Sequence, residues 1–331
     1  MLFYAPFSWA THNNLLEPID GMKGRQKSTI NLISRVEQGQ LASKNLGFGN
    51  SQLGFIFGPK ALKEHPEFDV VSIPGLRIAE YNFFADEIID LKPERVILYL
   101  SDKTIAAKPD VSPLRVHPVN IIELLKLRTR MLNSELDVDN QMFVSTIIEE
   151  LIYPHKYAFL LKAYAESYLL GTRALKYRRN NSKSKNKKNR KKAQNPDKSA
   201  IAEKQAEQQK KKKQQEIRRL LRRKKREFTE EHALFNLKEL SSFHEKLSSE
   251  SIDLIIVEGH YHPSVYNKHS EITKSVGTKL LTFAKERENV WFIPRSKLPK
   301  LVKEHYFDET HLNSGPSRKL FNSIQSNLET L

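Results

Sequence analysis

Residues 95–100, Arg-Val-Ile-Leu-Tyr-Leu, form a nearly unbroken apolar run that stops at Ser101 and Asp102. Such a short run, bounded by polar residues and containing β-branched and aromatic side chains, predicts a strand that is buried on both faces of a sheet. Sheets covered on both faces are usually parallel, because crossover helices lie on each face. This stretch therefore indicates an α/β protein.

Four further runs have the same character. Two lie closer to the N-terminus, at residues 68–73 and, more weakly, 46–49, and two lie at residues 252–257 and 289–293. Apolar residues at helical spacing precede the last two runs and follow them (Leu234, Leu237, Leu240 and Leu247; Ile272, Val276, Leu280, Leu281 and Phe283; Leu320, Phe321, Ile324 and Leu328). This alternation predicts a parallel sheet of about five strands flanked by helices, with a ligand crevice at the carboxyl ends of the strands.

The alternation is interrupted in the middle of the chain, which predicts five parts. The α/β body is divided between residues 45–117 and 229–331, and an N-terminal extension covers residues 1–44. Residues 118–178 have apolar residues at helical spacing and predict a helical insertion. Residues 179–228 form a basic low-complexity segment.

The basic segment carries almost all of the chain's excess charge. The 331 residues have a formal net charge of +16, but between Arg178 and Arg226 lie 22 of the 55 basic residues and 4 of the 39 acidic ones, so the remainder is nearly neutral. With few apolar residues, this segment is predicted to be disordered or a solvated helix. Its Lys and Arg clusters could bind nucleic acid or anionic lipid. A solvated insertion without a partner is an equally good interpretation.

The composition excludes several kinds of chemistry. The chain has no cysteine, which rules out disulfides, thiolate metal ligands and a cysteine nucleophile. The first ten residues lack the basic start of a secretory signal, and no stretch has the apolar length of a transmembrane helix. We therefore expect neither a cleaved signal nor an anchor in this chain, and the compartment stays open.

Two short polar segments could together activate a nucleophile. Ser51 follows Gly49 and Asn50 after the first predicted strand, and Asp308 and His311 precede the last predicted helix. A serine hydroxyl needs a base within hydrogen-bond reach, and a histidine base needs an orienting group on its other ring nitrogen. Taken separately, Ser51 could simply cap a helix, and Asp308 and His311 could be polar loop residues.

The order of these segments resembles the SGNH/GDSL hydrolase superfamily. The shared pattern is Gly-x-Ser after the first strand, Gly75 after the second and Asp-x-x-His before the last helix, and it is most similar to the bacterial envelope branch that includes alginate O-acetylation proteins and the D-alanine transfer protein. The resemblance implies a flavodoxin-like sheet and a serine esterase, lipase or O-acyltransferase without a cofactor. It also implies that Ser51 is the nucleophile, His311 the general base and Asp308 its orienting carboxylate.

The resemblance also implies an oxyanion hole. The backbone N–H groups of Ser51 and Gly75 occupy the family positions of two donors. The third family donor is the asparagine of a Gly-x-Asn-Asp block, and this chain departs from that block, since Ser101 and Asp102 stand in place of Asn-Asp. The Ser101 hydroxyl is the expected substitute. Loss of one donor costs about 10²- to 10³-fold in rate, which argues against efficient hydrolysis and leaves a specialised transferase or a degenerate site open.

Polar residues near other strand ends complete the predicted site. We expect Arg77, Asp102, His260 and His262 to bind substrate, because each follows a predicted strand. Glu258 with the two histidines could also form a metal site, but the spacing matches no strong ligand pattern, so no metal is expected. A polar loop that caps a helix is the simpler alternative.

Two functions follow as expectations. The first is a serine-dependent esterase or O-acyltransferase acting on an acylated carbohydrate or lipid, on the extracytoplasmic side of the cell envelope and with a membrane-bound acyltransferase as partner. The second is a catalytically inert SGNH-like scaffold, in the envelope or the cytoplasm, that binds polyanions or an anionic membrane through residues 179–228. Fold alone does not separate the two.

Overall fold

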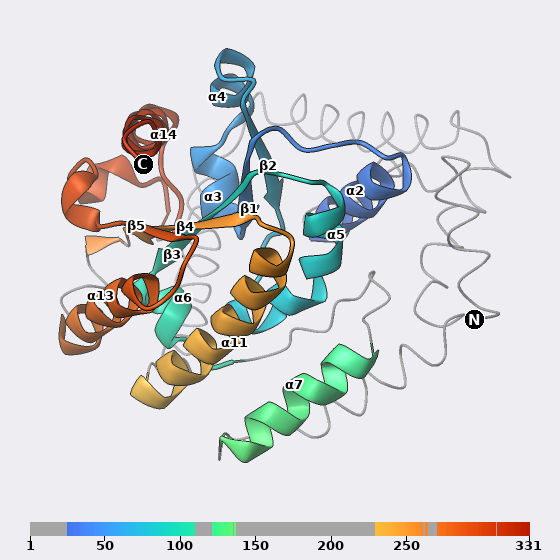
Figure 1. Cartoon of the computed structure of the whole chain (residues 1–331). Helices are drawn as coiled ribbons and strands as arrows, with labels where there is room; N and C mark the ends of the chain where they lie inside the picture. The colour runs from blue at the N-terminus through green and yellow to red at the C-terminus, as the bar shows by residue number, and fades with distance from the viewer. Residues whose placement is uncertain are drawn as a thin grey trace, which may run out of the picture. The chain divides into compact units, whose positions relative to one another are not determined.

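A five-stranded parallel sheet forms the centre of the computed structural model, which describes residues 25–109, 121–134, 136, 229–260, 262–263, 270–308 and 310–331. The strands are β1 (Asn45–Gly49), β2 (Phe68–Ser72), β3 (Arg95–Ser101), β4 (Asp253–Gly259) and β5 (Val290–Ile293). Their order in the sheet is β2-β1-β3-β4-β5, and all neighbours are parallel (Figure 1). This is the flavodoxin-like order, so the predicted α/β fold class is confirmed.

Helices cover both faces of the sheet and produce two hydrophobic clusters. Successive strand residues point to opposite faces, so Val96 and Leu98 of β3 join one cluster while Ile97 and Tyr99 join the other. The first cluster includes residues of α2 (Arg25–Glu37), η1 (Ile78–Phe83), α5 (Ala85–Asp90), α6 (Asp102–Ala106), α7 (Ile121–Asn133), α11 (Glu230–Ser249) and α13 (Ser270–Lys285). The second includes residues of α3 (Ser51–Ile56), α4 (Pro59–Glu64) and α14 (Ser314–Leu328). Two short 3₁₀ turns, η3 (Arg295–Lys297) and η4 (Lys303–His305), follow β5.

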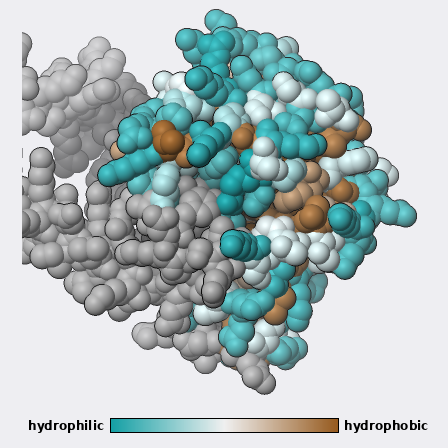
Figure 2. Space-filling view, turned by 90° about the vertical axis from the view of Figure 1, so that its left-hand side faces the viewer, coloured by the Kyte–Doolittle hydropathy of each residue, from teal (hydrophilic) through white to brown (hydrophobic). Residues whose placement is uncertain are grey.

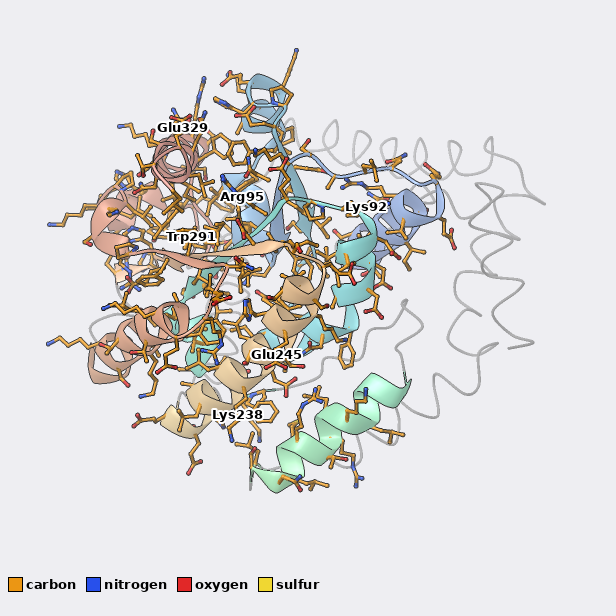
Figure 3. The ribbon with its side chains drawn as sticks, viewed as in Figure 1. Lys92, Arg95, Lys238, Glu245, Trp291 and Glu329 are labelled. Carbon is orange, nitrogen blue, oxygen red and sulfur yellow. The ribbon has the colours of Figure 1, made fainter. Side chains whose placement is uncertain are left out.

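The helices keep their predicted positions, but some of their buried faces differ from those predicted. On α11, Leu240 and Leu247 are fully buried as predicted, whereas Leu234 is 48% exposed and Phe243 takes a place in the core. On α13, Leu281 is also exposed. The opposite face of α11 carries charged residues such as Lys238 and Glu245 (Figure 3). The spacing of leucines predicted only part of the buried face of α11, because an aromatic side chain, Phe243, fills the rest.

Parts of the predicted outer segments contribute to the same core. Leu32 of α2, from the predicted N-terminal extension, is 1% exposed, and Leu127 and Met131 of α7, from the predicted insertion, are buried. The rest of residues 118–178 and all of residues 179–228 lie outside the described residues. The boundaries of those segments therefore stay predictions.

The surface of the described part offers no membrane-spanning element. None of its helices combines the length and the apolar character needed to cross a bilayer. On the face in Figure 2, hydrophobic residues form small patches separated by hydrophilic ones.

Candidate active site

Ser51 is placed by a tight connection between β1 and α3. The strand ends at Gly49, Asn50 is the N-cap, and Ser51 is the first residue of the helix. The Asn50 side chain accepts a hydrogen bond from the N–H of Gln52 at 2.9 Å, which is typical of an N-cap and fixes the start of the helix. Ser51 therefore lies at the carboxyl end of the sheet, as predicted, and is only partly buried.

His311 is placed by a compact loop ahead of α14. Tyr306 and Leu312 form an antiparallel bridge that closes this loop, and the Phe307 N–H donates to the His311 carbonyl at 3.1 Å. Inside the loop, Asp308 Oδ1 accepts from the N–H of Thr310 at 2.7 Å and from that of His311 at 2.8 Å. These bonds hold the aspartate and the histidine in one rigid turn.

A hydrogen bond from Gln52 attaches this loop to α3, the helix that begins with Ser51. Gln52 is buried, and its side-chain amide donates to the Thr310 carbonyl at 3.2 Å. No motif of the sequence points to Gln52. Because it is adjacent to Ser51, it couples the position of the serine to that of the histidine loop.

The two polar segments predicted to form the site meet at hydrogen-bond distance. Ser51 Oγ lies 2.8 Å from His311 Nε2, although the residues are 260 positions apart, and His311 Nδ1 lies 2.8 Å from Asp308 Oδ2. When Nδ1 carries the ring proton and donates a hydrogen bond to the carboxylate, Nε2 is free to accept the proton of the serine hydroxyl. The structure thus brings together all three residues for which the sequence predicted catalytic roles.

Asp308 is suited to remain a carboxylate. Partial burial would raise its pKa, but the hydrogen bond from the His311 side chain and those from the Thr310 and His311 N–H groups outweigh this and lower it below the ordinary value. A carboxylate that accepts several hydrogen bonds favours its charged form. It can therefore orient the imidazole and stabilise the imidazolium that forms when the ring accepts a proton.

Two exposed phenylalanines flank the imidazole. The ring of Phe307 stacks on that of His311 with centroids 5.6 Å apart and planes inclined by 14°, and the ring of Phe55 lies 4.6 Å away. Both rings are about half exposed, at 54% and 45%. They limit the movement of the imidazole and form an apolar rim. Their positions, one before Asp308 and one helical turn after Ser51, could have indicated this role in the sequence.

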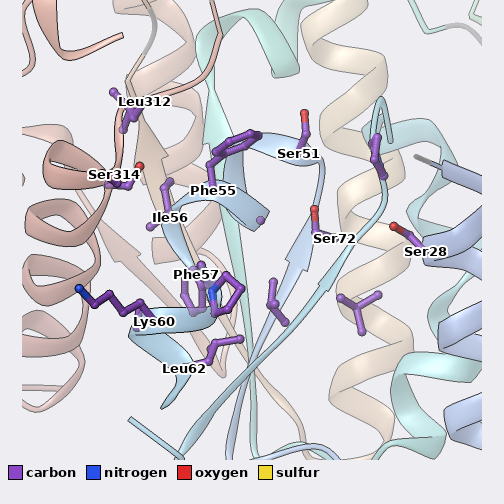
Figure 4. Close-up of a pocket in the computed structure, with 18 of the residues that line it drawn as sticks. Ser28, Ser51, Phe55, Ile56, Phe57, Lys60, Leu62, Ser72, Leu312 and Ser314 are labelled. Atoms are coloured by element: carbon purple, nitrogen blue, oxygen red, sulfur yellow. The ribbon is translucent and has the colours of Figure 1, made fainter. Parts of the chain in front are cut away.

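A pocket of about 900 Å³ opens beside the serine. Figure 4 shows Ser51 and Phe55 towards one end of it and Lys60 and Leu62 towards the other. Most of its lining is apolar (Leu32, Phe55, Ile56, Phe57, Pro59, Leu62, Val70, Pro74, Phe307 and Leu312). A concave site lined mostly by apolar side chains and by some polar groups is typical of a small-molecule binding site.

Gly75 lies in the turn that follows β2. The Leu76 N–H donates to the Ile73 carbonyl at 3.0 Å, and Gly75 has a φ of +75°. With Pro74 before it, this is a type II turn, whose third position requires a positive φ and so favours glycine. The turn alone explains the glycine, and its N–H as an oxyanion donor stays a prediction.

The structure places Ser101, the expected third oxyanion donor, in the interior of the protein. This residue is completely buried and is the N-cap of α6. Its hydroxyl accepts from the N–H of Thr104 at 3.3 Å and is paired with the Thr104 hydroxyl at 2.8 Å. A third oxyanion donor must reach the substrate, and this buried, paired hydroxyl gives the predicted role of Ser101 no support.

Asp102, predicted to bind substrate, is engaged in an ion pair within the protein, and its substrate role stays a prediction. Its side chain is 8% exposed and forms an ion pair at 2.8 Å with Arg295, which follows β5. The Arg295 guanidinium also contacts Glu258 at 3.3 Å, and the main-chain N–H of Arg295 donates to the same carboxylate at 2.8 Å. This cluster ties the ends of β3, β4 and β5 together.

The two histidines after β4, which the sequence predicts to bind substrate, are buried, so this role stays a prediction. His260 is 9% exposed, and its N–H donates to the Tyr99 hydroxyl at 2.6 Å. His262 is 8% exposed and packs edge-on against Tyr306. Among the described residues, no group of three or more acidic or histidine side chains is arranged to hold a metal ion.

Arg77 is likewise engaged within the protein. It precedes η1, and its guanidinium donates to the Lys108 carbonyl at 2.8 Å. It is partly buried and does not line the pocket beside Ser51. The structure therefore gives its predicted substrate-binding role no support, and the predicted ligands lie around the site instead of in it.

His260 should make the protein less stable in acid. Burial first, and then the nearby Arg295 guanidinium, lowers the pKa of His260 from 6.5 to about 4. Between these values the unfolded chain binds a proton that the folded protein does not, so the free energy of unfolding falls as the pH drops from 6.5 to 4, by on the order of 3 kcal/mol. Urea unfolding at pH 7 and pH 4 should show a smaller loss for His260→Phe than for wild type. Equal losses would contradict this role.

The fold and the site define an α/β protein in which a serine, a histidine and an aspartate are linked by hydrogen bonds at the carboxyl edge of a flavodoxin-like sheet. No known family profile and no curated protein sequence matches the chain.

Three solved structures are similar to it in outline. A provisionally assigned acylhydrolase from Bacteroides fragilis has 12% identity and a TM-score of 0.44, covering 91% of this chain and 96% of its own. A provisionally assigned platelet activating factor protein from Streptococcus pneumonia has 10% identity and a TM-score of 0.43, with coverage of 98% and 99%. A GDSL-like lipase from Bacteroides thetaiotaomicron has 9% identity and a TM-score of 0.41, with coverage of 87% and 88%. At these values the chemistry has to be argued from the site itself.

Proposed function

We propose that this protein is a serine-dependent acyl-ester hydrolase of the SGNH/GDSL type. One observation carries the proposal: the continuous hydrogen-bonded series from Ser51 Oγ through the two ring nitrogens of His311 to Asp308. Surface polar residues seldom have a reason to form this series across 260 positions of chain. It is the arrangement that converts a serine hydroxyl into a nucleophile.

The proposed reaction has two halves. In the first, His311 Nε2 takes the proton of Ser51 Oγ while the oxygen attacks the ester carbonyl, and the tetrahedral intermediate collapses to an acyl-serine as the protonated imidazole gives its proton to the departing alcohol. In the second, His311 takes a proton from water while the water oxygen attacks the acyl-serine carbonyl. The tetrahedral intermediate then collapses, the bond from the acyl carbon to Ser51 Oγ breaks, the carboxylic acid leaves, and His311 returns the proton to Oγ. Asp308 stays ionised throughout and orients the ring.

Two N–H groups are proposed to stabilise the oxyanion. Ser51 is the first residue of α3, so its N–H has no acceptor within the helix. Gly75 follows Pro74, which lines the same pocket as Ser51. With Ser101 removed from the set, two donors remain, and we expect slower turnover than in a site with three.

The apolar pocket supports an ester with an apolar acyl group. Transfer to a sugar hydroxyl in place of water would make the protein an O-acyltransferase, and an envelope location with a membrane-bound acyltransferase partner would suit that activity. These extensions are proposals that rest on the sequence resemblance alone. The alternative of polyanion binding depends on residues 179–228, which lie outside the described residues, and it stays a prediction.

Covalent labelling tests the function directly. A fluorophosphonate probe phosphonylates a serine only when a base activates it, so the wild-type protein should become labelled while Ser51→Ala should not. Circular dichroism should show the same fold for both proteins. An unlabelled, well-folded wild type would refute the proposal.

A further inference from the structure

The connection that presents Ser51 is held by two hydrogen bonds from the end of β2. The Ile73 N–H donates to the Gly49 carbonyl at 2.8 Å, which continues the strand pairing. The Ser72 hydroxyl donates to the next carbonyl, that of Asn50, at 3.1 Å. The first bond belongs to the backbone, but the second comes from a side chain and can be removed by substitution.

The Asn50 carbonyl belongs to the same peptide group as the Ser51 N–H. A trans peptide is planar, so its C=O and N–H point in opposite directions. The Asn50 carbonyl accepts from Ser72 and, at 3.3 Å, from the N–H of Gly54. Two donors on this oxygen fix the plane of the peptide and with it the direction of the Ser51 N–H.

Gly54 is the residue that lets this contact form. It lies one helical turn after Ser51, and a Cβ added to it would lie 2.4 Å from the Ser72 hydroxyl oxygen and 2.8 Å from the Ser72 Cβ. Any side chain at this position would push α3 away from the end of β2. The glycine therefore allows the close approach that brings Ser72 to the connection.

We propose that Ser72 is a positioning residue for the oxyanion hole, because its hydroxyl holds the Asn50–Ser51 peptide with the Ser51 N–H directed at the reacting carbonyl oxygen. This inference rests on the proposed function of Ser51. Ser72 lines the same pocket as Ser51 (Figure 4), but it acts through the Asn50 carbonyl and not on the substrate.

The kinetic test compares Ser72→Ala with wild type. Removal of a whole oxyanion donor lowers kcat by about 10²- to 10³-fold. In Ser72→Ala the Ser51 N–H stays but is held less firmly. We therefore expect kcat for an activated ester to fall by about 10- to 100-fold, with KM unchanged. Ser72→Thr keeps the hydroxyl and should recover most of the loss.

The matched control is Ser43→Ala. The Ser43 hydroxyl also donates to a main-chain carbonyl on the β1–β2 side of the sheet, that of Pro66 at 2.8 Å, but at the opposite end of the strands. It should leave kcat and KM unchanged. A loss of kcat in Ser43→Ala equal to that in Ser72→Ala would overturn the inference, because it would show a general effect on stability.

A measurement without substrate separates this inference from the proposed function. The Gly54 N–H shares the Asn50 carbonyl with Ser72, so its hydrogen exchange should be faster in Ser72→Ala and normal in Ser72→Thr and Ser43→Ala. Unchanged exchange in Ser72→Ala, or a loss of activity that appears in KM, would overturn the inference. If the fluorophosphonate probe fails to label wild type, the proposed function fails, while the exchange rate still shows whether Ser72 fixes the peptide.

Discussion

Ser51→Ala and His311→Ala should each lower kcat for an activated ester by on the order of 10⁴- to 10⁶-fold, and the double variant should be no slower than either. The serine without its base is a weak nucleophile, and the base without the serine has no nucleophile on the enzyme to activate. Residues that act as one unit therefore show losses that do not add. Single-turnover kinetics on the three variants and wild type would measure this.

The residual rate makes this prediction sharper. The N–H groups of Ser51 and Gly75 stay in place in all three variants, because they belong to the backbone. A small rate above that of the uncatalysed reaction should therefore remain. Losses that multiply in the double variant would show that the two side chains act independently and would contradict the triad. Thermal unfolding of each variant should match wild type.

Arg130→Ala should produce the largest loss of stability, about 3 kcal/mol in the free energy of unfolding. Arg130 on α7 forms a two-point ion pair with Glu239 on α11, with distances of 2.6 and 2.9 Å. The Glu239 side chain is 1% exposed, whereas that of Arg130 is 34% exposed. Removal of the arginine leaves the Glu239 carboxylate buried without its counter-ion. Among the described residues, the carboxylate then keeps a hydrogen bond from the neutral side-chain amide of Asn82 at 3.3 Å.

Two variants control for this loss. Arg318→Ala removes the arginine of an Arg–Glu pair whose side chains are 49% and 40% exposed, and it should cost less than about 1 kcal/mol. Arg130→Met combined with Glu239→Leu removes both charges and should be more stable than Arg130→Ala. Urea unfolding would measure all of them. Equal effects at Arg130 and Arg318 would mean that α7 is not held on α11 by this pair.

The sequence was a good guide to the fold because apolar periodicity is a local property. Each predicted run became a strand, with ends that moved by one or two residues, and the turn at Gly75 follows from the Pro-Gly pair. The buried face of α11 was harder to predict. The prediction used the spacing of leucines, whereas the packed face also contains Phe243 and the buried Glu239.

The sequence by itself determined the α/β class and pointed to the residues of the candidate triad, since the order of Gly49 to Ser51 and Asp308 to His311 relative to the predicted strands resembles a known pattern. Only the tertiary structure decided which of the other polar residues near the strand ends reach the pocket. Asp102 finds its partner 193 residues away in Arg295, and Ser101 and His260 are enclosed by helices and loops from elsewhere in the chain. The exposure of a polar side chain depends on what distant segments place over it, and no local pattern records that.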